Sequence, residues 1–426
     1  MKLTLLLLLT VVSITLSAQQ PNLQFFRSND KLGLNVYETS KFDTVGYTGV
    51  KVRLGGDFSM QFQGLNQSNS ANNLVELGTD FNLPSANLNL DVQLLAGVRM
   101  HLRTYLSSRH HNETWIKGGH IQIDKLDFVR KGFLEGVMKY TTFTIGLDEF
   151  NYGDAHFRRS DNARGIFNPF IGNYIMDAFS TEAFGEATVQ INGLLFMIGV
   201  TNGKLNQDVV VTSTSDNEPS LYGKLGVDKQ LNDDLRIRLT GSIYLNKGAT
   251  TGTWLYGGDR GGSRYYDVLH TQPDSLGNSE GSDFDGRYNA LFTKLTALQI
   301  NPFIKFKGLE FFGIYELASG SNTFTQPIVD KEGAFTQLAA ELVYRFGQNE
   351  RFYIGGRYNT VEGKTVESAT EDLKINRLNI GGGWFLSKNI VVKAEYVNQQ
   401  YTGNAWTGRF AGAKFNGFDI EAIISF

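Results

Sequence analysis

Apolar and polar residues alternate with a period of two through most of this 426-residue chain. In the first clear run, Val52, Leu54 and Phe58 share one parity, whereas Lys51 and Arg53 share the other. Successive side chains of a β-strand point to opposite faces, so each run predicts a strand with one apolar and one polar face. About sixteen such runs follow one another, including one over residues 75–83 and a long one over residues 90–102. The pattern predicts an all-β fold, a transmembrane antiparallel β-barrel of about 16 strands, with its apolar parity toward lipid.

The connections between the runs alternate in length. Tight turns such as Asn192-Gly193 and Lys307-Gly308 are interspersed with long links such as residues 248–290 and 319–335. Short turns at one end and long loops at the other are typical of membrane barrels. A soluble two-sheet sandwich also shows alternation, but roughly 400 residues of strand in one register are too many for it. A mean hydropathy of −0.22 argues against a membrane-spanning helix bundle.

Three regions follow from this pattern. Residues 1–18 are interpreted as a signal peptide, with Lys2 before an apolar stretch and Ala18 at the cleavage site. Residues 19–50 alternate weakly and are interpreted as a periplasmic N-terminal lead-in, and residues 51–426 form the barrel. The chain has no cysteine, which excludes disulfides and lipid attachment through a thiol. The net charge of −3 argues against a nucleic-acid partner. We therefore expect a multi-pass barrel in the outer membrane of a Gram-negative cell.

A stretch without periodicity interrupts the strands at residues 151–178. It begins with the charged run NYGDAHFRRSDN and continues with aromatic residues at Phe167, Phe170 and Tyr174. A long loop with its own aromatic residues and adjacent arginines is more than a plain connector. We interpret it as the third external loop, folded inward as a pore constriction. Its candidate constriction residues are Arg158, Arg159, Arg164, Asp154, Asp161 and Asp177.

The polar parity of the strands would line the lumen. Rings of charged side chains set ion preference in narrow pores, and the arginine fork suits phosphate or carboxylate groups. The alternative is that many of these charges pair with one another and hold the loop against the wall. The candidate lumen residues are Arg53, Arg99, Arg103, Arg236, Arg238, Arg345, Arg351, Arg357, Arg377, Glu182 and Glu186.

The sequence offers no catalytic, cofactor or metal motif. None of the six histidines has the spacing of a zinc-binding helix, so neither a metal site nor an enzyme is expected. Acidic residues in the glycine-rich segment 248–290 could coordinate calcium, but solvated loop acids are commoner. These residues are Asp259, Asp267, Asp274, Asp283 and Asp285.

Several segments resemble a porin family of the Bacteroidetes outer membrane that is related to the phosphate-selective porins O and P. The most specific match is residues 151–162, continued by NPFIGNY at 168–174. Further matches are GLNVYE at 33–38, FQGL at 62–65 and NPFIKFKGLE at 301–310. The resemblance implies a porin fold and passive transport, with a homotrimer as the expected assembly. It does not imply phosphate selectivity, because the wall charges of this chain are of both signs.

Together these features predict a porin for passive diffusion of small hydrophilic solutes, with a mild anion bias. One alternative is a substrate-specific channel for phosphate or organic anions, and another is a surface adhesin or scaffold built on a plugged barrel. The expected partners are outer-membrane lipid, small polar or anionic solutes, and the barrel-assembly machinery, which would read the C-terminal strand ending at Phe426.

Overall fold

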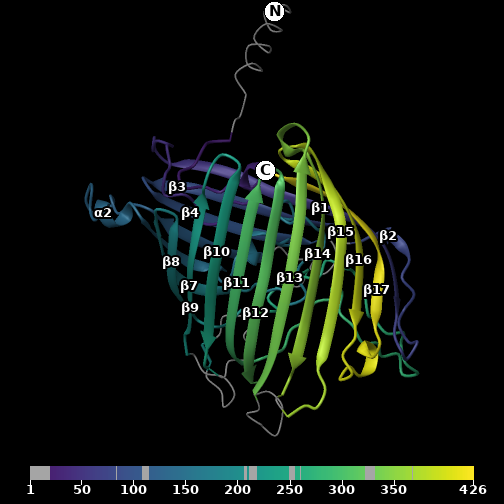
Figure 1. Ribbon diagram of the computed structural model, residues 1–426. Helices are drawn as coiled ribbons and strands as arrows, with labels where there is room; N and C mark the ends of the chain where they lie inside the picture. The colour runs from purple at the N-terminus through teal and green to yellow at the C-terminus, as the bar shows by residue number, and fades with distance from the viewer. Residues whose placement is uncertain are drawn as a thin grey trace, which may run out of the picture.

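The computed structural model describes residues 20–82, 84–107, 115–205, 209–210, 218–248, 255–259, 261–321, 332–366 and 368–426. The predicted signal peptide lies outside these ranges. Within them, sixteen antiparallel strands close into a barrel and one short extra strand, β2, pairs with β1 (Figure 1). The predicted fold class is therefore confirmed. The strands are β1 (Lys51–Ser68), β2 (Thr79–Phe81), β3 (Ser85–Leu95), β4 (Val98–Ser107), β5 (Trp115–Ile123), β6 (Thr141–Glu149), β7 (Thr181–Ile191), β8 (Leu194–Thr201), β9 (Ser220–Gln230), β10 (Leu235–Asn246), β11 (Lys294–Phe306), β12 (Leu309–Ser321), β13 (Glu332–Phe346), β14 (Phe352–Lys364), β15 (Leu373–Ser387), β16 (Ile390–Tyr401) and β17 (Lys414–Ser425).

Helical structure in these ranges is limited to single turns. They are η1 (Lys31–Gly33), α2 (Glu135–Met138), η2 (Ala155–Phe157), η3 (Gln348–Glu350) and η4 (Gly408–Phe410). No helix in the described ranges has the length and apolar character needed to cross a membrane.

The long strand β1 closes the barrel by pairing on both sides. Its residues 57–68 pair with β17, and its residues 51–59 pair with β3. At the junction, the backbones of Gly56 and Phe426 exchange two hydrogen bonds of 3.1 Å. Backbone N–H and C=O groups in hydrocarbon need partners within the protein, and a closed ring supplies them for every strand.

Alternate residues of each strand face the outside and the inside of the barrel. On β13, the side chains of Leu338 and Leu342 are 49% and 53% exposed, whereas Glu341 and Arg345 on the other parity are buried. The same apolar outer parity recurs on the other strands, so the outer surface is a continuous apolar belt. Such a surface is stable in lipid rather than in water.

The predicted strand count is right because two errors in strand assignment cancel. The sequence predicts one long strand over residues 90–102, but the structure has a hairpin there that turns at Ala96-Gly97 between β3 and β4. A β-bulge between Gln93 and Leu95 adds one residue, so odd-numbered side chains face inward on both strands. The apolar–polar alternation therefore continues through the turn without a break, and the sequence pattern does not reveal the turn. Conversely, the strand predicted over residues 75–83 is reduced to the three-residue β2.

The two ends of the barrel differ as the lengths of the connections predict. The start of the described chain, the C-terminus and the short turns lie at one end, at the top of Figure 1, and the long connections lie at the other. The exception is the segment 124–140, which carries α2 and joins β5 to β6 at the end with the short turns. This arrangement brings the segment that precedes β1 to the end with the short turns.

That N-terminal segment, the predicted periplasmic lead-in, contacts the inner side of the ring. Gln24 hydrogen-bonds with β3 (2.8 Å), Lys31 with the turn between β15 and β16 (2.8 Å), and Asn35 with β12 (2.7 Å). Glu38 then forms an ion pair with Arg238 of β10 at 2.8 Å. Residues 24–38 therefore cross the opening of the barrel and reach into it.

A lipid-facing charge tests the orientation of the wall. The substitution Leu338→Arg, near the middle of β13, is expected to destabilise the folded barrel by about 2–4 kcal/mol because it places a charge in hydrocarbon. Leu309→Arg is the matched control at the start of β12, next to a turn, and should cost about 0–1 kcal/mol. Equilibrium unfolding in urea from lipid vesicles measures both. Equal effects of the two substitutions would contradict a membrane-embedded position for Leu338.

Candidate functional site

Residues 150–180, which join β6 to β7, contact strands on every side of the ring. All of them are buried except Phe157 and Asn162, which are partly exposed. Only a segment inside the ring can reach strands from β3 to β16. The hydrogen bonds that join this loop to the wall include Asp161–Asn87, Asp154–Arg238, Asp154–Asn301, Tyr174–Glu341, Ile175–Asn359 and Ile171–Glu395.

Aromatic residues of the loop pack against one half of the wall. Phe167 and Phe170 lie in a cluster of buried apolar residues from β13 to β17, and Tyr174 packs with Phe303 and Phe312 on β11 and β12. Burial of several such rings stabilises the loop by about 1.5–3 kcal/mol for each side chain that leaves water. The loop is therefore fixed against β11–β17 and leaves space near the opposite strands.

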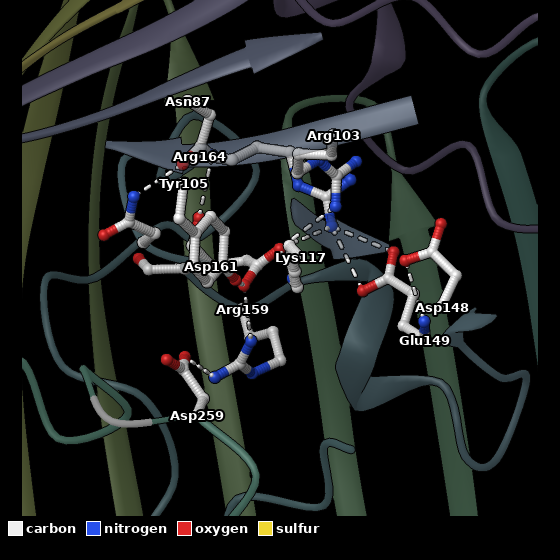
Figure 2. Close-up of polar contacts among 12 residues, drawn as sticks. Asn87, Arg103, Tyr105, Lys117, Asp148, Glu149, Arg159, Asp161, Arg164 and Asp259 are labelled. Atoms are coloured by element: carbon white, nitrogen blue, oxygen red, sulfur yellow. Dashed lines mark hydrogen bonds and ion pairs between the residues drawn. The ribbon is translucent and has the colours of Figure 1, made fainter. Parts of the chain in front are cut away.

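Asp161 is the centre of the polar contacts on the other side of the loop (Figure 2). Its carboxylate is fully buried and accepts hydrogen bonds from Tyr105, Lys117 and Arg103, the last at 3.1 Å. Arg164 lies 3.6 Å away. Burial by itself raises the pKa of Asp161, but Lys117, Arg164 and Arg103 together lower it to about 2. Asp161 is thus an ionised group that joins the loop to β4 and β5.

The six predicted constriction residues all lie in this loop, and each is 9% exposed or less. Each has at least one partner of opposite charge. The pairs are Arg158–Glu341 (3.4 Å), Arg159–Asp177 (2.6 Å), Arg164–Glu149 (2.9 Å), Asp154–Arg238 (2.7 Å) and Asp161–Arg103 (3.1 Å). Arg159 also contacts Asp259, an acid that the sequence suggests only as a calcium ligand. This pattern fits the alternative in which loop charges hold the loop in place.

A polar cavity of about 200 Å³ remains beside the strands that the loop leaves uncovered. It lies between the N-terminal segment, the loop and the wall from β3 to β7. Of the predicted site residues, only Arg164, Arg99, Arg103 and Glu186 line it. The charged groups of its lining are Arg27, Arg99, Arg103 and Arg164, against Glu38, Asp91, Asp148, Glu149 and Glu186.

Sequence reasoning did not select Arg27 and Glu38, because both lie in the predicted lead-in. Glu38 belongs to the segment GLNVYE, which carries part of the family resemblance. That resemblance is the sequence feature from which Glu38 could have been selected as a site residue. Arg27 donates to the carbonyls of Gly33 (3.1 Å) and Phe157 (3.0 Å), and its guanidinium lies 4.0 Å from the ring centre of Phe167.

The other predicted lumen residues lie away from this cavity. Arg236 and Arg345 line a second cavity of about 540 Å³ beside the N-terminal segment. Five are buried on inward-facing positions of the wall: Arg238, Arg345, Arg357, Arg377 and Glu182. Arg345 pairs with Glu310 at 2.8 Å and Arg357 with Glu341 at 2.7 Å. Arg53 and Arg236 are partly exposed. Arg351 does not line the wall, because it is exposed in the turn after η3.

No protein-family model matches the chain, and no curated protein matches it in sequence. Its fold is similar to that of the anion-selective porin from Comamonas acidovorans, with 10% identity over 88% of this chain and 100% of that chain, and a TM-score of 0.52. The outer membrane channel DcaP of Acinetobacter baumannii gives 11% identity, 89% and 99% coverage, and a TM-score of 0.52. OmpT, an outer membrane protein of Vibrio cholerae, is 10% identical over 90% of this chain and 99% of that chain, with a TM-score of 0.51.

At these identities the similarity establishes the fold and not the solute. A closed antiparallel barrel with an apolar outer belt and the fold of these outer-membrane proteins defines the class of the protein. It is a porin-like, multi-pass β-barrel of the outer membrane.

Removal of the Asp161 charge tests its role in holding the loop. Asp161→Asn leaves Lys117 and Arg103 buried without their carboxylate, which is expected to destabilise the barrel by about 3–5 kcal/mol. Asp234→Asn, in the exposed turn between β9 and β10, removes a 3.7 Å pair with Lys307 and should change stability by about 0–1 kcal/mol. Urea unfolding in detergent at pH 7 compares the two. Similar small effects would contradict a structural role for the Asp161 network.

The pH dependence of the same variants gives a second measurement. Because the pKa of Asp161 is about 2 in the folded protein and about 3.9 in an unfolded chain, its stabilisation is present above pH about 4. It is lost as the pH falls toward 2. The difference in unfolding free energy between wild type and Asp161→Asn should therefore narrow over that range, and a constant difference would contradict ionised Asp161.

Proposed function

We propose that the protein is a passive channel for small hydrophilic solutes. The observation that carries this proposal is the polar cavity inside the barrel, beside the strands that residues 150–180 leave uncovered. Charged and amide side chains dominate its lining, and they can replace the water of a passing solute. The path would be off-centre, along β3–β7, with the N-terminal segment at one end.

The mild anion bias predicted from the sequence is part of this proposal, and Arg27 supports it. Within the described ranges this guanidinium has no carboxylate at ion-pair distance, whereas Arg99, Arg103 and Arg164 are each paired. Arg27 would therefore add to the path a positive charge without an acid at ion-pair distance, in a lining that holds four arginines and five carboxylates in all. The nearly equal numbers of arginines and carboxylates in the lining limit the bias. They also weigh against the alternative of a channel specific for phosphate or organic anions.

The plugged-barrel alternative has an observation of its own. Inward side chains from β10 to β17 are buried beneath the loop and the N-terminal segment, including Arg357, Asn359 and Arg377. A surface adhesin or scaffold would need no open path through them. The relation to Bacteroidetes porins, assembly as a homotrimer and recognition of the strand ending at Phe426 by the barrel-assembly machinery stay predictions.

Solute passage separates the channel from the plugged barrel. Liposomes that contain the purified protein are expected to swell when a pentose is added outside, because the sugar and water follow the gradient through the cavity. Liposomes with the heat-denatured protein are the control. If no swelling occurs while the protein migrates as a folded barrel, the passive-channel proposal fails and the adhesin or scaffold is favoured.

Reversal potentials in planar bilayers under asymmetric KCl test the position of the path. Arg27→Ala is expected to lower the anion-to-cation permeability ratio by about two- to fivefold, which corresponds to about 0.5–1 kcal/mol from one partly solvated charge. Arg351→Ala is the matched control, since Arg351 is exposed in a turn outside the cavity. An unchanged ratio for Arg27→Ala in a conducting barrel would mean that ions do not pass this cavity.

A further inference from the structure

Two histidines face each other inside the cavity. His101 on β4 and His120 on β5 are directly opposed in the antiparallel register, and both line the cavity. Side chains at opposed positions on one face of a sheet have Cβ atoms about 4.5–5.5 Å apart. Their imidazole rings have centroids 5.3 Å apart, at an angle of 37°. The pair is therefore close enough to share one ligand.

Each ring is oriented by its own carboxylate. The Nδ1 atom of His101 lies 3.0 Å from Asp91, and the Nδ1 atom of His120 lies 2.9 Å from Asp148. An ionised carboxylate only accepts hydrogen bonds, so both Nδ1 atoms carry hydrogen and donate. The Nε2 atoms are then the ones available as ligands. Histidines that bind metals are oriented by carboxylates in this way.

The Nε2 atom of His101 is a buried polar atom without a partner. His101 is only 8% exposed, and its Nε2 has no hydrogen bond within the described ranges. A buried polar nitrogen without a partner is costly, and a ligand in the cavity would remove that cost. His120 is more accessible, with 19% of its side chain exposed, so a solute in the cavity can reach the pair.

The charge around the pair also suits a cation. The cavity lining holds five carboxylates against four arginines, and three of these arginines, Arg99, Arg103 and Arg164, are paired with acids. Asp91 and Asp148 are the carboxylates in contact with the two imidazole rings.

We propose that His101 and His120 form a binding site for a divalent transition-metal ion such as Zn²⁺, Cu²⁺ or Ni²⁺. With metal–nitrogen bonds of about 2.0–2.1 Å and a tetrahedral angle, two imidazoles on one ion have centroids roughly 5.2 Å apart. The observed separation of 5.3 Å matches this value. Imidazole ligands select this class of ion over Mg²⁺ or Ca²⁺. Water or a solute would complete the coordination, and Asp91 and Asp148 are positioning residues. The inference concerns binding and does not depend on conduction.

Isothermal titration of tag-free, EDTA-treated protein with Zn²⁺ in detergent tests the site. The background carries His110→Gln, His111→Gln and His270→Gln, because His270 lies near Asp267 and Asp283 in a second possible cation cluster and the other two lie outside the described ranges. We expect one Zn²⁺ per chain. Adding His101→Gln and His120→Gln should abolish it, and unchanged stoichiometry and affinity would overturn the proposal.

Matched substitutions separate ligands from neighbours. His156→Gln changes a third histidine of the same cavity, whose Nε2 bonds to Asn151 (3.0 Å) and whose buried Nδ1 has no partner in the described ranges. Its ring packs on Phe157 and not on another imidazole, so Zn²⁺ binding should persist. Asp91→Asn should weaken Zn²⁺ affinity by about 10- to 100-fold while the stoichiometry stays at one. Loss of Zn²⁺ binding in His156→Gln with no effect of Asp91→Asn would overturn the assignment of the ligands.

A measurement without ligand substitutions covers the case in which the double variant does not fold. Electron paramagnetic resonance of Cu²⁺ bound to the background protein should show hyperfine coupling to two imidazole nitrogens. Coupling to one nitrogen or none at a stoichiometric site would overturn the paired site. If the same protein binds inorganic phosphate through these histidines and no metal, the site is an anion site and the proposal fails.

Discussion

The structure depends on the need to satisfy every backbone hydrogen bond where the chain meets lipid. An open sheet would leave the edges of β1 and β17 without partners in hydrocarbon, at several kcal/mol for each exposed group. The pairing of β1 with both β3 and β17 removes those edges. In the closed ring, the apolar side chains of each strand face the lipid, and the polar side chains that alternate with them face the interior. The interior is therefore polar as a consequence of closure.

The second consequence of closure concerns the charges inside. Arginines and acids that share a narrow, low-dielectric interior must pair or remain hydrated, because an isolated buried charge is strongly unfavourable. Residues 150–180 supply partners for this purpose, as the contacts of Asp154, Arg159 and Asp161 show. Most charges that look suited to selecting solutes are thus used to hold the loop. The groups that remain at the cavity come partly from the N-terminal segment, which contributes Arg27 and Glu38.

The asymmetry of the interior links the packing to the proposed path. Phe167, Phe170 and Tyr174 fix the loop on the β11–β17 side, and the cavity that the loop borders lies along β3–β7. The opposed pair of His101 and His120 is on that uncovered side. A single set of aromatic contacts therefore decides which wall residues meet a solute and which are buried under the loop.

The sequence alone determined the fold class, because a period of two and a regular alternation of turn lengths depend only on neighbouring residues. It also identified the loop that carries Arg158–Asp161, as an aperiodic insertion. Strand boundaries were less secure: the bulge before Gly97 preserved parity across a turn, so no break in the pattern marked it. Tertiary structure alone decided which charges pair, which face the cavity, and that His101 meets His120. Those facts depend on the register between strands and on contacts between residues far apart in the chain, such as Asp57 with Ser425. A local pattern contains no information on such distances.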